Sequence, residues 1–268
     1  MAKPAGAPMT RVTAITSRDN ALLVRMRKLL AQPDAYRKLG EVWIEGEALC
    51  RAFTSISAGV PAQALIGATA WNDPALASLA SRAEAVAVVA DALMAELVTL
   101  ETAARIAFVV RWPGPGAMLG DAPSVVLDRV QDAGNVGTIL RSAAAFGCTQ
   151  VIALKGTAAL WSPKVMRSAM GAHFALHLVE SAEPEALERL TVPLLATSPH
   201  AVEPIHLFAL PWPCAWIVGH EGQGIDAALQ RRCVAILKIA QPGTGESLNV
   251  AAAAAICLYE SARRRLTA

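Results

Sequence analysis

The sequence predicts an α/β protein in which helices cover a buried, mainly parallel sheet. Of its 268 residues, 54% are hydrophobic and only 5% aromatic, and Ala, Val, Leu and Ile are typical of helices packed on parallel strands. From Val125 onward, short apolar strands alternate with helical segments, a pattern that predicts a parallel sheet with helices on both faces. The length allows one large domain or two ordinary ones.

The best domain boundary is residues 111–123, which contain three Pro and three Gly. We expect a disordered tail over residues 1–10, a small α/β unit over 11–110, a linker over 111–123 and a larger α/β domain over 124–268. In the small unit we expect a loop and then an amphipathic helix between Val12 and Leu30, with Ser17 and Asn20 as candidate caps. The other expected elements there are strands at 42–44, 64–66 and 85–89 and a helix at 48–53.

In the larger domain we expect strands at 125–127, 151–154, 192–196, 215–218 and 235–239. The expected helices are 135–146, 184–190 and 247–265. In parallel sheets, ligands bind beyond the carboxyl ends of the strands. The loops after Leu127, Ala196, Val218 and Ile239 are therefore where we expect chemistry.

Charge is distributed unevenly along a chain whose net charge is only +2. Residues 11–38 contain seven basic residues and two acids, whereas 53–110 contain more acids than bases. Such a basic face can bind RNA phosphates, and we select Arg18, Arg25 and Lys28 as candidate RNA contacts. The alternative, on charge alone, is a solvated helix face.

Several classes of protein are disfavoured by the sequence. It has no apolar run of about 18 residues, so we expect no membrane span. The five cysteines are scattered without Cys-x-x-Cys spacing, and with no signal peptide this favours the reducing cytoplasm. No cluster of metal-ligand residues is present, so we expect no metal site.

The first chemical motif is residues 127–141, where a strand enters a polar loop and then a helix. Gly134 and Gly137 permit close approach of a ligand to the backbone, and Asn135 is a plausible N-cap. Arg141 lies six residues further on and would have to reach back to share a site with Asn135. Taken alone, the motif is more typical of a capped helix with a surface arginine.

The second motif is the glycine-rich turn of residues 216–225, again at the end of a strand. It lacks both the dinucleotide fingerprint and the phosphate-binding Gly-Lys-Ser/Thr. Glu221 is an acid in a turn that a ligand can approach closely. His220 has the chemistry of a general base, although a solvent-facing turn histidine is the simpler interpretation.

The third motif is residues 237–251, where a strand leads through a Pro-Gly loop into the last helix. Glu246 or Ser247 could cap that helix. Ser247 and Asn249 supply uncharged hydrogen-bonding groups at its start. The alanines at 251–255 permit close packing, or are simply good helix formers.

Together, the three motifs resemble those of the SpoU (TrmH) family of RNA ribose methyltransferases, within the SPOUT superfamily. The most specific piece is Ser-Leu-Asn-Val at 247–250, and the resemblance covers roughly residues 124–260. The front of the chain resembles the ribosomal-protein-like substrate-binding domain that often precedes this catalytic domain. Its matching segments are residues 15–20, 29–30, 36–37 and 43–47.

The resemblance implies an α/β-knot catalytic domain with a deep trefoil knot, a homodimer, and S-adenosylmethionine as cofactor. It implies 2′-O-methylation of structured RNA, and ribosomal RNA is favoured over transfer RNA because the front domain is of the ribosomal-RNA type. Carried over by motif, the cofactor contacts are Thr197, Gly219, Ile239 and Leu248. The catalytic and target-binding positions are Asn135, Arg141, Glu221, Ser247 and Asn249.

In the implied reaction, a ribose hydroxyl attacks a sulfonium methyl group, so the enzyme must align the two and help the hydroxyl lose its proton. A guanidinium stays protonated, so we assign Arg141 to binding the target phosphate and stabilising the emerging alkoxide. The identity of the proton acceptor stays open. Ala240, Gln241 and Ala251 depart from the usual family pattern and His220 is at a variable position, so RNA specificity is not transferred.

Two other readings stay open from the residues. A Rossmann-type methyltransferase or dehydrogenase would need a glycine fingerprint after its first strand, which the loop at 128–137 lacks. A non-catalytic RNA-binding protein with a vestigial cofactor site would still contain the fold, and cofactor binding would distinguish it. Methylation of transfer RNA is the alternative within the family.

Overall fold

The computed structural model describes residues 10–97, 104–243 and 247–266. Apart from Thr10, the expected tail at 1–10 lies outside the described residues. The chain divides into two compact units between Gly114 and Pro115, with Trp161–Pro163 grouped with the first unit. Each unit is built around a sheet of its own.

The first unit contains a five-stranded mixed sheet in the order β1-β4-β3-β5-β2. Strand β5 is antiparallel to both β2 and β3, whereas the β1–β4 and β3–β4 pairs are parallel. The predicted strands at 42–44, 64–66 and 85–89 are confirmed. The strands are β1 (Arg11–Ile15), β2 (Glu41–Glu45), β3 (Gln63–Gly67), β4 (Ala85–Val89) and β5 (Ile106–Arg111).

The expected loop from Val12 is wrong, because these residues form the edge strand β1. The segment is short and four of its five residues are exposed, so it lacks the buried apolar run that predicted the other strands. Backbone pairing with β4 supplies its stability instead. The following helix was predicted correctly: Asn20 caps it through a 2.9 Å hydrogen bond from the Leu22 amide to Oδ1.

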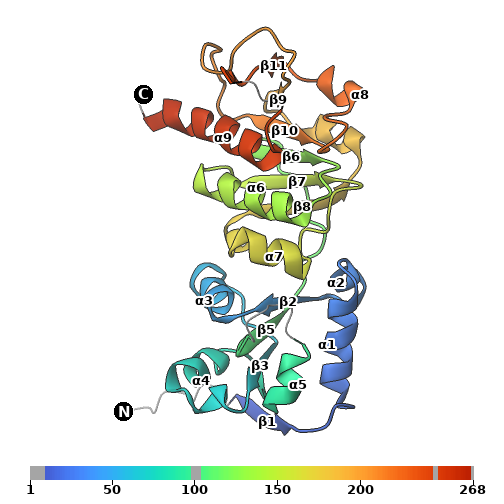
Figure 1. Ribbon diagram of the computed structural model, residues 1–268, viewed down its shortest axis with the longest axis vertical. Helices are drawn as coiled ribbons and strands as arrows, with labels where there is room; N and C mark the ends of the chain where they lie inside the picture. The colour runs from blue at the N-terminus through green and yellow to red at the C-terminus, as the bar shows by residue number, and fades with distance from the viewer. Residues whose placement is uncertain (1–9, 98–103, 244–246, 267–268) are drawn as a thin grey trace, which may run out of the picture. The chain divides into compact units, whose positions relative to one another are not determined.

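The helices of the first unit connect these strands (Figure 1). They are α1 (Ala21–Ala31), α2 (Ala35–Leu39), α3 (Glu47–Ile56), η1 (Ala70–Asn72), α4 (Pro74–Ala80) and α5 (Asp91–Ala95). The parallel strands β1 to β4 end at one edge of the sheet, where β5 begins.

The second unit contains a six-stranded sheet in the order β11-β9-β10-β6-β7-β8, with every neighbouring pair parallel. This confirms the parallel sheet predicted from the alternation of strands and helices. The strands are β6 (Ser124–Asp128), β7 (Gln150–Leu154), β8 (His177–Ala182), β9 (Leu194–Thr197), β10 (Ala215–Gly219) and β11 (Ala235–Leu237). Their carboxyl ends therefore meet at one edge.

Helices α6 (Ala133–Ala145) and α9 (Val250–Leu266) pack against each other beside this sheet (Figure 1). Trp216 of β10 donates a 3.0 Å hydrogen bond from Nε1 to Ser261 Oγ and so ties α9 to the central strand. The remaining helices are α7 (Pro163–Ala169), η2 (Ala172–Ala175), η3 (Pro184–Arg189) and α8 (Ala227–Gln230).

Two helix predictions need correction. The segment expected as a helix at 184–190 is the 3-10 helix η3, which begins at a proline and ends after six residues. The last helix begins at Val250 rather than at 247, because the side chain of Asn249 provides its cap.

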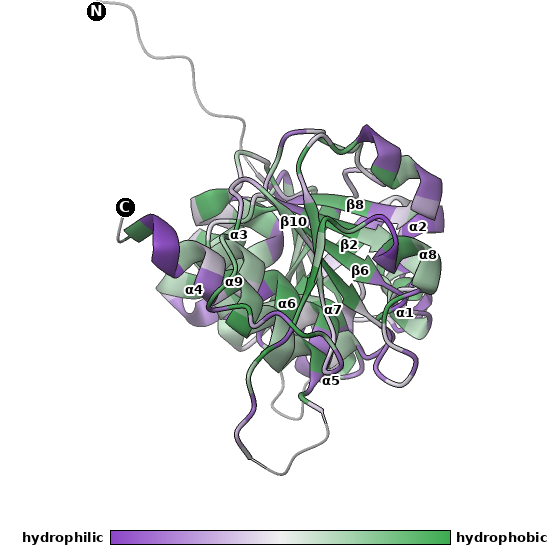
Figure 2. Ribbon diagram, turned by 90° about the horizontal axis from the view of Figure 1, so that it is seen from above, coloured by the Kyte–Doolittle hydropathy of each residue, from purple (hydrophilic) through white to green (hydrophobic). Residues whose placement is uncertain are grey.

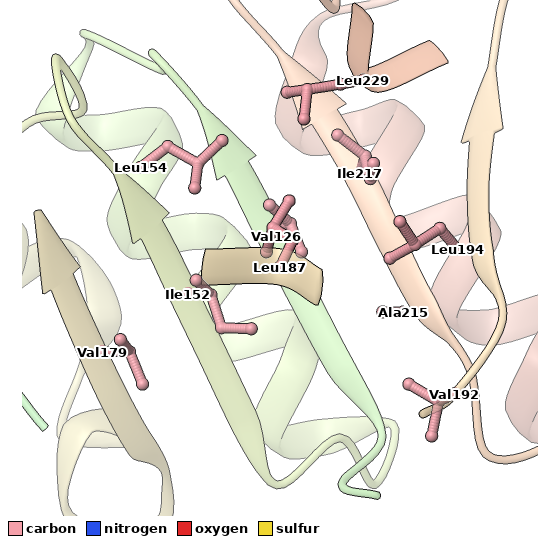
Figure 3. Packing of buried hydrophobic residues seen from close by; sticks show 10 residues of the cluster. All are labelled: Val126, Ile152, Leu154, Val179, Leu187, Val192, Leu194, Ala215, Ile217 and Leu229. Atoms are coloured by element: carbon pink, nitrogen blue, oxygen red, sulfur yellow. The ribbon is translucent and has the colours of Figure 1, made fainter. Parts of the chain in front are cut away.

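A cluster of buried aliphatic side chains forms the core on one face of the six-stranded sheet (Figure 3). Leu187 of η3 lies across β6 and β7 there, while Leu229 of α8 lies at the carboxyl end of β10. The strands are apolar along their length, shown in green for β6 and β10 in Figure 2, whereas the last turn of α9 is purple. No helix among the described residues is long and apolar enough to cross a bilayer.

Candidate functional site

A cavity of about 350 Å³ opens at the carboxyl ends of β9, β10 and β11. The sequence predicted a site at the loops that follow these strands. The volume of the cavity lies in the range of small-molecule sites. The walls combine apolar side chains with backbone and uncharged polar groups. They are formed by Thr197, Ser198, Pro199, Val218, Gly219, His220, Glu221, Gly224, Ile225, Ile239, Gln241, Ser247, Leu248, Asn249, Val250 and Ala253.

The turn after β10 forms one wall of this cavity. The His220 amide donates to the Gly224 carbonyl at 3.0 Å, and the Gly224 amide donates back to the His220 carbonyl at 2.8 Å. Gly219 must be glycine, because a Cβ there would lie 2.3 Å from the carbonyl carbon of Gly224. The sequence therefore closes a tight turn whose backbone borders the cavity.

His220 shapes this turn with its side chain. Its Nδ1 accepts hydrogen bonds from the Gly222 amide at 2.9 Å and the Gln223 amide at 3.2 Å. His220 is thus a partly exposed turn histidine, as the simpler interpretation predicts, and it also lines the cavity and bonds to its own turn.

The loop after β6 is ordered by Asp132 rather than by Asn135, which corrects the predicted cap. Asp132 Oδ1 accepts from the Asn135 amide at 2.8 Å, so the N-cap of α6 lies three residues earlier than expected. An aspartate at this position satisfies an orphan amide of the first turn. The Asn135 side chain is consequently left for other contacts.

Glu221 joins the second motif to the first. Its Oε2 accepts from the Gln131 amide at 3.2 Å, and its Oε1 accepts from the Asp132 amide at 3.1 Å and from Asn135 Nδ2 at 3.2 Å. Burial raises the pKa of Glu221, but the hydrogen bonds it accepts outweigh this, and the net effect lowers that pKa. The carboxylate is therefore held in its ionised form.

Asn249 joins the third motif to the first. Its Oδ1 accepts from the amides of Ala251 at 2.9 Å and Ala252 at 3.2 Å, which caps α9, and its Nδ2 donates to Asn135 Oδ1 at 2.9 Å. Predicting Ser247 or Glu246 as this cap was wrong for Ser247, while Glu246 lies outside the described residues. Capping α9 fixes the orientation of the Asn249 side-chain amide. Its bond to Asn135 in turn orients the Asn135 amide, which donates to Glu221.

The structure brings together eight of the nine predicted site residues. Seven line the cavity: Thr197, Gly219, Glu221, Ile239, Ser247, Leu248 and Asn249. Asn135 joins them through its bonds to Glu221 and Asn249. Arg141 is exposed on α6, is not among the lining residues, and makes no hydrogen bond or ion pair with another described residue.

The three predicted RNA contacts in the first unit do not share one environment. Arg18 lies 3.2 Å from Glu96, which Arg27 also contacts at 3.1 Å. Arg25 lies 3.2 Å from Glu41. Lys28 is exposed and has no acidic partner within the described part of the chain. The local excess of basic residues is thus partly neutralised by acids distant in sequence.

Sequence reasoning did not select several residues of the cavity, including Ser198, Pro199 and Ala253. The first two directly follow Thr197, so extending the predicted loop at Thr197 by two residues would have found them. Ala253 carried no polar signal and lines the cavity only because α9 passes beside it. Within the described ranges, no group of three potential metal ligands is present.

Residues 122–259 match the model of the SpoU rRNA Methylase family, which spans just over half of the chain. The chain belongs to the SpoU rRNA methylase family.

Similar proteins extend this assignment beyond the methylase domain. An uncharacterized tRNA/rRNA methyltransferase of Synechocystis is 30% identical over 97% of this chain and 98% of its own. A 23S rRNA guanosine-2′-O-methyltransferase of Bacillus subtilis is 39% identical over 59% of this chain and 65% of its own. The AdoMet-bound structure of an rRNA methyltransferase from Sinorhizobium meliloti superposes with a TM-score of 0.83, 25% identity, and coverage of 95% and 98%.

Proposed function

We propose that this SpoU methylase transfers a methyl group from S-adenosylmethionine to a ribose 2′-hydroxyl of ribosomal RNA. The observation that carries the proposal is the relay Asn249–Asn135–Glu221, which joins the three family motifs beside one cavity. The similarity to rRNA methyltransferases over nearly the full chain supports ribosomal RNA as the substrate.

The residues around the cavity fit S-adenosylmethionine. Val218, Ile225 and Leu248 offer apolar surface for an adenine ring, and Gly219, which has no side chain, lets a ligand approach its backbone closely. Ile239 also lines the cavity. We assign cofactor binding to Thr197, Gly219, Ile239 and Leu248. When bound, the cofactor supplies a methyl group already activated by the sulfonium charge.

The chain's own polar groups then serve the target. Ser247 and Asn249 are exposed at the cavity and can donate to ribose oxygens. Glu221 is poorly suited as a base because its carboxylate already accepts three hydrogen bonds and its pKa is lowered. We assign Glu221 and Asn135 to positioning the loops rather than to proton removal.

Arg141 remains our candidate for holding the target phosphate and stabilising the developing alkoxide. Its guanidinium is exposed and has no partner among the described residues, so it is available to a phosphate. Arg141 is not part of the cavity wall. This role therefore requires that bound RNA, or a second subunit, bring the target ribose and Arg141 into one site.

A homodimer through the catalytic domain is part of this proposal. One face of α9 presents Ala252, Ile256 and Tyr259 to solvent, with Ile256 38% and Tyr259 53% exposed. Phe146 packs edge-on against Tyr259 with ring centroids 5.8 Å apart, which extends this apolar stripe onto the end of α6. Exposed contiguous apolar surface of this kind is typical of an interface.

We also propose the trefoil knot of the family for the second unit and an RNA-binding role for the first. Strands β10 and β9 lie between β6 and β11, so strands that are not consecutive in the chain are neighbours in the sheet. The five free thiols fit a reducing cytoplasm. Exposed Arg18, Arg25 and Lys28 are the proposed phosphate contacts in the first unit.

The experiment is methylation of ribosomal RNA from a strain lacking the gene, with radiolabelled S-adenosylmethionine and mapping of the modified ribose. We expect one 2′-O-methylated nucleotide in ribosomal RNA and none in transfer RNA. Label found only in transfer RNA would mean that transfer RNA, and not ribosomal RNA, is the substrate. Cofactor binding without transfer to any RNA would favour the non-catalytic RNA-binding reading.

Neutralising Arg18, Arg25 and Lys28 together tests the first unit. RNA affinity should fall and its dependence on salt should flatten, while S-adenosylmethionine affinity stays unchanged. Unchanged RNA affinity across salt would mean that this basic segment is only a solvated helix face.

The proposed reaction needs no metal. Activity that is lost with a chelator and restored by magnesium, on an RNA whose fold is unaffected, would contradict this.

A further inference from the structure

Arg129 has an unusual backbone conformation directly after β6. Its φ of 58° lies in the left-handed region, which residues other than glycine seldom adopt. Such a conformation persists only where surrounding contacts fix it, and it is common at functional sites. In this protein, the contacts of the Arg129 side chain fix the conformation of its backbone.

The side chain of Arg129 spans three loops at the carboxyl edge of the sheet. Its stem passes over Gly156 in the loop after β7, where an added Cβ would lie 3.2 Å from Arg129 Cγ. Its guanidinium binds Asp128 twice, from Nε to Oδ1 at 2.8 Å and from Nη2 to Oδ2 at 3.1 Å. The remaining Nη1 donates to Gln223 Oε1 at 3.0 Å, in the loop after β10.

Asp128 makes a second contact with the loop after β10. Its carboxylate is buried, with 3% of the residue exposed, and Oδ2 also accepts from the Asp226 amide at 2.7 Å. A buried carboxylate must be paired, and Arg129 provides the pairing charge. Together Asp128 and Arg129 bind the loop at Gln223 and at Asp226, on either side of Gly224.

This attachment complements the one made by Glu221. Glu221 of the β10 loop accepts from amides of the β6 loop, while Asp128 and Arg129 of the β6 loop bind the β10 loop. Between Gln223 and Asp226 lie Gly224 and Ile225, both of which line the cavity. The wall formed by the His220–Gly224 turn is therefore held from two sequence positions.

We propose that Arg129 is a positioning residue for cofactor binding: it holds the His220–Gly224 turn as the wall of the S-adenosylmethionine pocket. The inference rests on the proposed function only in identifying the ligand of that pocket. Arg129 does not line the cavity, so it acts through Gln223 and Asp226 and not by contact with the cofactor.

The test separates positioning from overall stability. Arg129→Gly removes the side chain but keeps a residue that tolerates positive φ, so the melting temperature should fall by less than about 4 °C. The Kd for S-adenosylmethionine should rise about tenfold, while turnover at saturating cofactor changes little. Gln223→Ala should raise Kd in the same direction, and Gln223→Glu, which keeps the acceptor, should restore it.

Arg189→Ala, an exposed arginine on η3, is the matched control and should leave Kd unchanged. An unchanged Kd in both Arg129→Gly and Gln223→Ala overturns the proposal. A Kd that rises only in Arg129→Gly, together with a large loss of melting temperature, also overturns it in favour of a purely structural role. The Kd for S-adenosylmethionine tests only the positioning role of Arg129. Failure of the wild type to methylate ribosomal RNA would instead contradict the proposed function.

Discussion

Asn249 and Asn135, 114 residues apart, are joined by a 2.9 Å hydrogen bond between their side-chain amides. The direction of this bond is fixed at both ends. Asn249 Oδ1 is occupied by the amides of α9, so its Nδ2 must donate, and Asn135 then donates its own Nδ2 to the carboxylate of Glu221. The start of α9, the start of α6 and the β10 turn therefore form one hydrogen-bonded unit.

Asn135→Asp tests this unit. The new carboxylate would face Glu221 Oε1, where Nδ2 now donates at 3.2 Å, and repulsion between like charges should separate the loops. We expect at least a tenfold loss of methylation, about 1.4 kcal/mol, measured in single-turnover assays with saturating RNA. Activity equal to the wild type would mean that the bond to Glu221 is not used.

Glu221→Gln tests the ionised carboxylate. The pKa of Glu221 is lowered in the folded protein, so its stabilisation is present above the ordinary carboxyl pKa of about 4.3 and is lost as the pH falls through the folded value. We expect the variant to be less stable by about 1 kcal/mol at neutral pH, with the difference shrinking in acid. Denaturant titrations across pH measure it, and a difference that grows in acid would contradict the assignment.

Gly219→Ala tests the close approach of the backbone. A Cβ at this position would lie 2.3 Å from Gly224, so the turn must move and the cavity wall with it. We expect S-adenosylmethionine affinity to fall by tenfold or more, as measured by calorimetry. Gly222→Ala in the same turn is the matched control, because its Cβ would meet only the His220 ring at 3.8 Å. Equal affinities in the two variants would refute the argument.

Arg141→Lys keeps the charge of this exposed side chain but loses its planar fork. We expect turnover to fall on the order of a hundredfold, the scale for removing a preorganised charge-stabilising donor, with cofactor affinity nearly unchanged because Arg141 does not line the cavity. Single-turnover methylation measures the step. Near-normal turnover in Arg141→Ala would remove the residue from the mechanism.

Ile256→Asp tests the proposed dimer. A carboxylate on the exposed stripe of α9 would have to be desolvated in an interface, so sedimentation should report a monomer with reduced activity. Val202→Asp, at a residue 93% exposed elsewhere in the unit, is the control. A fully active wild-type monomer of 28.1 kDa would contradict the dimer.

The sequence alone was sufficient for most of the architecture. The apolar runs at 85–89 and 125–127 became β4 and β6, because buried strands need continuous apolar residues wherever they lie in the sheet. The resemblance to SpoU methyltransferases placed Thr197, Gly219, Ile239 and Leu248 at the cofactor site, and all four line one cavity because loops at the carboxyl ends of parallel strands meet at one edge. These inferences depend on short-range patterns that are visible along the chain.

Only the tertiary structure decided which polar groups meet. Asp132, not Asn135, caps α6, which leaves the Asn135 side chain to bond Glu221 and Asn249. Asn249, not Ser247, caps α9 with its Oδ1 while its Nδ2 reaches Asn135. Arg18 meets Glu96 across 78 residues, so a basic stretch in the sequence is partly neutral in space. Hydrogen bonds and ion pairs need specific atoms within about 3 Å, and that proximity is set by how the strands are ordered in the sheet, which local residue patterns do not encode.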